Sequence, residues 1–243
     1  MEVAMKSYED DIFTGMIPVV KTDDPVEGEW IKIKNKIPKS ALMQIYNVFN
    51  HCQRKLDRSE GFVVLMNNDG PVWAVGVPKQ WNGGAHVDAH PESDAGTIFK
   101  NVVGDAHSHP MMSAYHSGVD EADEAKHRHG IYIVFSSTDK GFSLMTSMVD
   151  VIGIVRGRKY QLDPNDVFDL ESKLEAPPLV PANWDENIST KECPKCPKRN
   201  SFGKPYGKGS KGMSPEERTM ERRSFKDWLK SVGRDKSNFG GGY

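Results

Sequence analysis

The sequence predicts an α+β domain, because one amphipathic helical pattern is combined with several short strand-like runs. Residues 41–50 place Leu42, Ile45, Val48 and Phe49 on one helical face. The strand-like runs are rich in β-branched and aromatic residues and are bounded by Gly, Asn, Asp and Pro. These runs are residues 30–34, 61–66, 72–77, 102–107, 131–135, 142–145 and 149–155. A chain of 243 residues is long enough for one medium domain with a core and some appended segments.

The composition favours a protein of the cytoplasm. No apolar run approaches the roughly 20 residues that span a bilayer, and acidic residues stand near the N-terminus where a signal peptide would be basic and then apolar. The chain has three cysteines, Cys52, Cys193 and Cys196, which do not form a disulfide framework and suit a reducing compartment. We therefore expect a cytoplasmic protein with no membrane partner.

The ends of the chain differ in pattern from its middle. No sustained periodicity precedes residue 28, residues 78–97 look like a long loop, and the segment from Asp163 is rich in Pro, Lys and Gly. Ser214 and Glu217 form a capping box that begins a late helix. The pattern therefore predicts an N-terminal extension, a catalytic body, a linker, a C-terminal helix and a flexible tail, over residues 1–27, 28–162, 163–213, 214–233 and 234–243.

The C-terminal region is basic. Residues 191–236 hold 14 Lys and Arg against 6 Asp and Glu, although the whole chain has a net charge of −2. A nucleic acid or another acidic partner is conceivable for such a segment, but a solvated linker is the favoured interpretation. Cys193 and Cys196 are only half of a closed zinc site, so exposed thiols are favoured there over a second metal shared between two chains.

Metal-binding residue types concentrate between residues 104 and 120. His107 and His109 are two residues apart, so on a strand their side chains point to the same face. Pro110 then ends the strand, and ten residues separate His109 from Asp120, which leaves enough chain for Asp120 to return from another element. Two histidines and one carboxylate are a usual ligand set of catalytic zinc, in which the fourth position stays open.

Such a zinc ion makes hydroxide available at neutral pH and polarises a scissile carbonyl, so the sequence favours hydrolysis. Ser117 stands at the entrance of the helix expected over residues 118–129. Its hydroxyl can cap that helix or donate a hydrogen bond to a developing oxyanion, and the sequence leaves both roles open.

These residues resemble the JAMM or MPN-type metallopeptidases, whose pattern is His-x-His-Pro, six residues, Ser, two residues, Asp. Every position of the pattern is present between His107 and Asp120. The wider run looks like a phage- and plasmid-associated bacterial branch of that family, and the corresponding residues are Ala114, Tyr115, Ser117, Gly118, Asp120, Asp123 and Glu124. The resemblance covers about residues 29–160.

The resemblance implies a curved mixed β-sheet flanked by helices, with the cytidine-deaminase-like architecture of that family, and one zinc ion per chain. It implies hydrolysis of an amide or isopeptide bond, commonly at the C-terminal tail of ubiquitin or a ubiquitin-like protein. The family's general base is a Glu at the start of a core strand, and Glu60 stands at that position. The Gly that usually follows three residues later is replaced by Val63. Glu29 and Glu92 lie elsewhere in the chain and remain alternatives for the base.

Other functions remain open beside the metallopeptidase. The domain can be a zinc-containing binding or assembly module without catalysis, or it can hydrolyse cell-wall peptides in a phage. A zinc nucleobase deaminase is disfavoured, because Glu192 rather than Pro precedes Cys193. The sequence names neither the protein substrate nor the oligomeric state.

Overall fold

The structure of the chain is a computed structural model. It describes residues 3–20, 25–56, 58–67, 70–83, 86–90, 99–110, 112–118, 120, 129–137 and 148–191.

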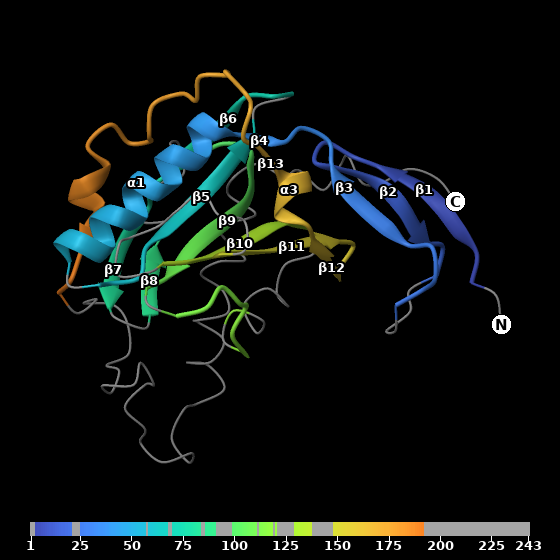
Figure 1. Ribbon diagram of the computed structural model, residues 1–243, viewed down its shortest axis with the longest axis horizontal. Coiled ribbons are helices and arrows are strands. Elements are labelled where there is room, and N and C mark those ends of the chain that lie inside the picture. The colour runs from blue at the N-terminus through green and yellow to red at the C-terminus, as the bar shows by residue number, and fades with distance from the viewer. Residues whose placement is uncertain are drawn as a thin grey trace, which may run out of the picture.

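A six-stranded sheet forms the body, with the strand order β12-β11-β10-β9-β5-β6 (Figure 1). Strands β9 and β10 pair in parallel and the other neighbours are antiparallel, so the sheet is mixed. The α+β fold class predicted from the sequence is therefore confirmed. The strands are β5 (Phe62–Asn67), β6 (Trp73–Gly76), β9 (Val102–His109), β10 (Gly130–Ser136), β11 (Val149–Val155) and β12 (Arg158–Leu162).

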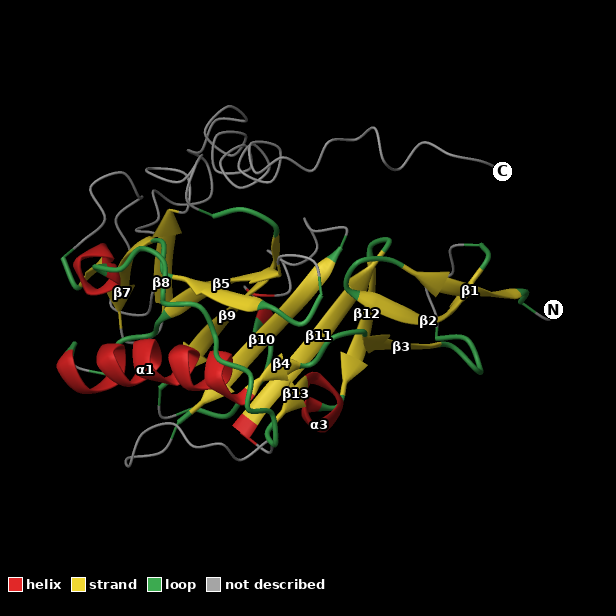
Figure 2. Ribbon diagram, turned by 90° about the horizontal axis from the view of Figure 1, so that it is seen from above, coloured by secondary structure: helices red, strands yellow, loops and turns green. Residues whose placement is uncertain are grey.

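One helix, α1 (Lys39–Lys55), covers one face of this sheet (Figures 1 and 2). The apolar stripe predicted for it is buried, and Ile45, Val48 and Phe49 are fully inaccessible to solvent. The ring of Phe135, on β10, lies 5.5 Å from the ring of Tyr46 and 5.6 Å from that of Phe49, measured between centroids. This aromatic contact joins α1 to the middle of the sheet.

The N-terminal region is a folded part of the molecule, so its prediction as a loosely packed extension was wrong. Strands β1 (Met5–Glu9), β2 (Phe13–Pro18) and β3 (Trp30–Ile33) form an antiparallel sheet beside β12 (Figure 1). Phe13 and Ile17 lie two strand periods apart on β2 and are 0% and 3% exposed. Their burial against the body explains why this hairpin does not remain a loose segment.

Residues 79–83 and 86–90 form an antiparallel pair, although residues 78–97 were predicted as a loop. The strands are β7 (Lys79–Gly83) and β8 (His86–His90), and β14 (Ile188–Ser189) adds to the other edge of β7. The prediction was wrong for these residues, and residues 91–98 lie outside the described part of the chain.

Residues 163–191 pack along the body and are not the linker that the sequence predicted. They contain α3 (Pro164–Val167), β13 (Phe168–Asp169), which pairs with β4 (Ile37–Pro38), and the 3-10 helix η2 (Trp184–Asn187). Val180 extends the edge of β6, because its carbonyl accepts from Val77 N–H at 2.8 Å and its N–H donates to Val75 O at 3.1 Å. This strap over β6 satisfies backbone groups that an edge strand would otherwise present to solvent.

Several predictions fall outside the described residues. They are the strand over residues 142–145, most of the helix over 118–129, the remainder of the linker to residue 213, the C-terminal helix over 214–233 and the tail over 234–243. None of the helices that the structure describes has the length and apolar character needed to span a membrane.

Candidate metal centre

Strand β9 places His107 and His109 on the face of the sheet opposite to α1. Between them in sequence, Ser108 is directed the other way, and the preceding Ala106 is fully buried in the core with α1. The side chains of His107 and His109 are 12% and 5% exposed. The alternation along a strand therefore produces the pair of same-face imidazoles that the sequence predicted.

Asp120 reaches the two histidines from the segment after β9. Gly118 and Asp120 are helical, and Ser117 precedes them. Ser117 N–H donates to Asp120 Oδ2 at 2.7 Å, while Asp120 N–H donates to Ser117 Oγ at 3.4 Å. This reciprocal arrangement is a capping box, so the capping role considered for Ser117 is present. A hydroxyl that accepts a hydrogen bond still has its own proton to donate, so the oxyanion role stays a prediction.

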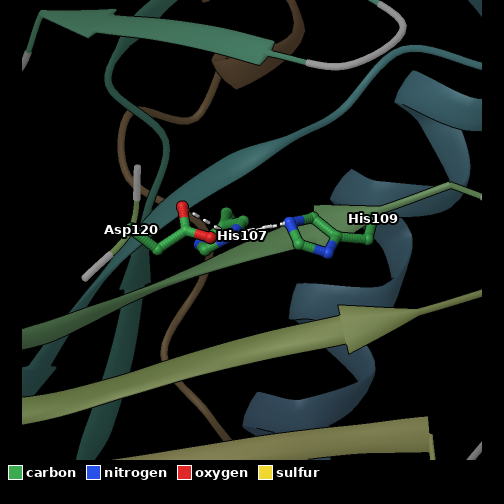
Figure 3. A group of neighbouring side chains, drawn as sticks. All are labelled: His107, His109 and Asp120. Carbon is green, nitrogen blue, oxygen red and sulfur yellow. Dashed lines mark hydrogen bonds and ion pairs between the residues drawn. The ribbon is translucent and has the colours of Figure 1, made fainter. Parts of the chain in front are cut away.

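The three side chains converge on one point, as Figure 3 shows with His107 between Asp120 and His109. The Nε2 atoms of His107 and His109 are 3.2 Å apart. Asp120 Oδ1 lies 3.3 Å from His107 Nε2, and Asp120 Oδ2 lies 3.8 Å from His109 Nε2. Tetrahedral zinc with bonds of about 2.0–2.1 Å separates its ligand atoms by about 3.3 Å. The donor set and its spacing therefore fit a zinc ion.

The protonation states also favour a cation. Burial lowers the pKa of His109, the neighbouring His107 lowers it further, and Asp120 and the Ser113 carbonyl only partly oppose this. His109 Nδ1 lies 3.4 Å from Ser113 O, which favours a proton on Nδ1 and a lone pair on Nε2. Burial alone would raise the pKa of Asp120, but the hydrogen bond and charge of His107, together with Ser117, hold that pKa well below its ordinary value. The site therefore presents a neutral imidazole and a carboxylate.

Glu60 lies at the N-terminal end of β5, next to the strand that carries the histidines. Phe62 pairs with His107, and Ser108 N–H donates to Gly61 O at 3.0 Å, so the next residue along, Glu60, is beside His109. A Cβ on Gly61 would come within 2.9 Å of Cys52 Sγ, so Gly61 faces α1 and the flanking side chains face the metal side. Glu60 is 6% exposed. This position suits the proposed base, whose role stays a prediction.

Two buried amides that the sequence did not single out hold this end of β5. The Gln80 side chain pairs with the backbone of Phe62 in both directions, at 2.9 Å to its N–H and 2.8 Å to its carbonyl. Asn82 Nδ2 donates to the carbonyl of Glu60 and to Gln80 Oε1. Gln80 is 0% exposed and Asn82 is 5% exposed. Strand β7 therefore positions Glu60 through these side chains and through one backbone hydrogen bond, in which Glu60 N–H donates to Gly83 O at 2.8 Å.

The alternatives for the base and for a second metal receive no support from the described residues. Glu29 forms an ion pair with Arg158 at 2.7 Å and lies before β3, while Glu92 is outside the described part of the chain. Within the described ranges, His107, His109 and Asp120 are the one group of three or more His, Cys, Asp and Glu side chains that could hold a metal ion, with all ligand atoms within 4.8 Å of one another. Cys193 and Cys196 lie outside those ranges.

The remaining cysteine does not offer a nucleophile. Cys52 is a buried free thiol on α1, and burial raises its pKa to about 12. It therefore stays protonated at neutral pH and away from the site face of the sheet.

Residues 54–148 match the family model described as prokaryotic homologs of the JAB domain. The matched range contains the two histidines, Asp120, Ser117 and Glu60, and begins within α1. The match supports a domain of the JAB/MPN family in this part of the chain, and the mixed sheet is compatible with the fold of that family. No curated protein matches the chain.

Proposed function

We propose that the protein is a zinc-dependent metallopeptidase that hydrolyses an amide or isopeptide bond. The observation that carries this proposal is the convergence of two Nε2 atoms and one carboxylate at separations of 3.2, 3.3 and 3.8 Å. His107, His109 and Asp120 would hold the metal, and three protein ligands leave a fourth position open, as catalytic zinc requires. A zinc ion held there supplies an acidified water and polarises the scissile carbonyl.

The chain's own residues then carry the proton. Glu60 accepts a proton from the attacking water and returns it to the leaving amine, so that a carboxylic acid and an amine are formed, which ionise at neutral pH to a carboxylate and an ammonium group. Ser117 has a hydroxyl proton that it can donate to the oxygen of the tetrahedral intermediate. The imidazole of His109 is held neutral at neutral pH, so a proton does not compete with the metal for its Nε2 atom.

The substrate class that we propose is an extended protein tail, such as that of a ubiquitin-like protein. The support is the match to the JAB family, together with the resemblance of the residues from His107 to Asp120 to the JAMM metallopeptidases. A Gly-Gly tail has no side chains, so it would suit a site whose histidines are only 12% and 5% exposed. A cell-wall peptide also contains amide bonds and remains a second substrate for the assay.

Glu60→Gln tests the mechanism, because the change removes proton acceptance and nearly preserves size. We expect the zinc content to stay at the wild-type level and the rate to fall by about a hundredfold to ten-thousandfold. The assay combines elemental analysis with cleavage of an isopeptide-linked ubiquitin-like substrate and of a cell-wall peptide. Glu29→Gln is the matched control, since Glu29 is a partly buried glutamate that pairs with Arg158 away from the metal.

Each result of this assay bears on the proposal. Loss of rate confined to Glu60→Gln, with zinc retained, supports the metallopeptidase and the base. Wild-type rate in that variant means that the base lies elsewhere. Zinc-loaded wild-type protein that cleaves neither substrate contradicts the peptidase and favours a binding or assembly module. Retention of zinc alone does not distinguish these functions.

A further inference from the structure

The histidine ligands and the aspartate ligand of the proposed metal centre are positioned in different ways. His107 and His109 belong to β9, which is paired on both sides within the sheet. Asp120 belongs to the segment that follows β9 and enters no strand. Near β9 this segment is joined by weak contacts, since Met112 N–H lies 3.4 Å from His109 O and Ser113 O lies 3.4 Å from His109 Nδ1. The rings of His109 and Tyr115 also lie 5.4 Å apart, and a contact from another strand adds to these within the described residues.

Asp150, at the start of β11, supplies a contact from a distant part of the sheet. Its Oδ2 accepts from the backbone N–H of His116 at 3.3 Å, across 34 residues of sequence. It lies in register with the metal centre, because Asp150 pairs with Val134 on β10 and Val134 pairs with His107 on β9. Side chains of paired residues share a face of a sheet. Asp150 therefore stands on the metal side, two strands away from the first ligand.

The Asp150 carboxylate is itself held in place. Gln161 Nε2, on β12, donates to Asp150 Oδ1 at 2.6 Å and also to Val151 O at 3.1 Å. With Oδ1 engaged by Gln161, Oδ2 is directed to the segment that leads to Asp120. A carboxylate that accepts two hydrogen bonds from different elements is well suited to act as a rigid anchor.

The residue that Asp150 contacts is buried at the base of the ligand segment. The His116 side chain is 4% exposed, and its Nε2 lies 3.9 Å from Asp150 Oδ2. Ser117 and Asp120 follow at once, joined by the capping box described above. A shift of the His116 backbone would therefore move the capping box and with it the Asp120 carboxylate.

We propose that Asp150 is a positioning residue for the metal centre, which acts through the His116 backbone to hold the Ser117–Asp120 turn over His107 and His109. The proposal rests on the metal site of the proposed function, but the anchoring of the segment is a property of the protein alone. Asp150 and Gln161 both lie beyond the matched residues 54–148. The metal centre therefore depends on strands outside the range that the family model matches.

The first experiment measures the anchor without any metal. Hydrogen exchange of peptides covering residues 112–120 is followed in chelator-treated wild type, Asp150→Ala, Asp150→Asn and Gln161→Ala. We expect faster exchange in Asp150→Ala, a rate close to wild type in Asp150→Asn because an amide oxygen still accepts from His116 N–H, and an intermediate rate in Gln161→Ala. Glu29→Ala is the control for general destabilisation, since it breaks the partly buried ion pair with Arg158 and should leave this segment unchanged.

The second experiment measures the metal. Zinc affinity is determined by chelator competition, and the visible spectrum of the Co²⁺-loaded protein reports the ligand geometry. Asp150→Ala should bind zinc at least about tenfold more weakly and should have an altered Co²⁺ spectrum, as expected when support for a ligand is lost. Asp150→Asn should restore most of both, and Glu29→Ala should lower the unfolding temperature without changing either.

The two experiments separate the anchor from the proposed function. If Asp150→Ala exchanges faster than wild type, the anchor is supported. If the wild type at the same time binds no metal, the metallopeptidase is overturned and the anchor is not. Unchanged exchange, affinity and spectrum in Asp150→Ala overturn the anchor and leave the metallopeptidase intact. If Asp150→Ala does not fold, Asp150→Asn and Gln161→Ala are compared in the same two assays. Wild-type behaviour of Gln161→Ala in both assays then overturns the anchor.

Discussion

The two faces of the six-stranded sheet perform different tasks, although the same strands form both. Toward α1 the sheet presents apolar side chains that are 0–1% exposed, among them Leu65, Ala106, Ile133 and Phe135. The other face carries His107, on β9, and Asp150, on β11. Each of these residues is next in sequence to one that faces α1. Because side chains alternate along a strand, neighbouring residues such as Ala106 and His107 lie on different faces of the sheet. Substitutions on the two faces should therefore have separable effects.

The largest expected effect is loss of the metal from the site face. His107→Ala or His109→Ala should weaken zinc binding by more than about a hundredfold, which is the upper end of the effect of losing only a supporting partner of a ligand. The folded state should persist, because neither imidazole belongs to the apolar core. Elemental analysis of purified protein and far-ultraviolet circular dichroism measure the two properties together.

His51→Ala is the matched control on the opposite side of the sheet. His51 lies on α1, where its ring is 5.3 Å from that of Trp184, and it should leave zinc content unchanged. Equal zinc in wild type and in the double variant of His107 and His109 would contradict the site assignment and direct attention to Cys193 and Cys196.

The next effect concerns the core face. Phe135 is fully buried against Tyr46, Phe49 and Phe168. Phe135→Ala should lower the free energy of unfolding by about 3–5 kcal/mol, through lost burial and the cavity that remains. Zinc affinity of the folded protein should change little, because the ring points away from the metal. Denaturant unfolding and chelator competition test this, and a loss of zinc affinity as large as that of His109→Ala would show that the two faces are coupled.

The site face was easier to predict from sequence than the elements that support it. His107 and His109 are two residues apart on a run of strand-forming residues, and Asp120 follows within the length of one loop. Strands β5, β6, β9, β10 and β11 also have local apolar patterns, and Gly70, which belongs to the Asp-Gly pair expected to form the turn before β6, has a φ of +102°. Local spacing and periodicity were sufficient for these features.

Strand β7 was missed because its buried positions are polar. Lys79 and Trp81 alternate with Gln80 and Asn82, and it is the two amides that are buried. An apolar alternation is therefore absent, and the segment looks like a loop in sequence. The Gln80 amide and Asn82 Nδ2 form hydrogen bonds with the Glu60–Phe62 backbone, a partner that no local pattern identifies, and these bonds favour the burial of both side chains.

The strap over residues 163–191 was missed for a related reason. Its hydrogen bonds go to the edge of the body, from Val180 to Val75 and Val77 and from Asn187 Nδ2 to Val77 O at 2.8 Å. Those partners are about a hundred residues away in sequence. The strap itself shows no sustained helical or strand period in its sequence. The contact of Asp150 with His116 is likewise long-range, so only the folded structure brings the anchor and the ligand segment together.

The smallest expected effect is a pH dependence on the site face, measured in the metal-free protein. Burial and the neighbouring His107 lower the pKa of His109 from its ordinary value of 6.5, so the unfolded chain binds a proton more readily than the folded one. The free energy of unfolding should therefore decrease as the pH falls below about 6.5. The lowered pKa of Asp120 has the same sign, but its contribution is lost only as the pH falls below its ordinary value of 3.8. Denaturant unfolding between pH 7.5 and 5 thus isolates the histidine.

His109→Asn tests this assignment, because it removes the titrating group and keeps a polar side chain of similar shape. The stability difference between wild type and the variant should be largest at pH 7.5 and should narrow toward pH 5, since only the wild type loses stability from this position. Chelator must be present throughout, because protons also compete with a metal for the same imidazole and would release it in that range. Parallel curves of unfolding free energy against pH for the two proteins would contradict the assignment to His109. Phe135→Ala is the control, and its curve should run parallel to that of wild type, since its core position carries no titrating group.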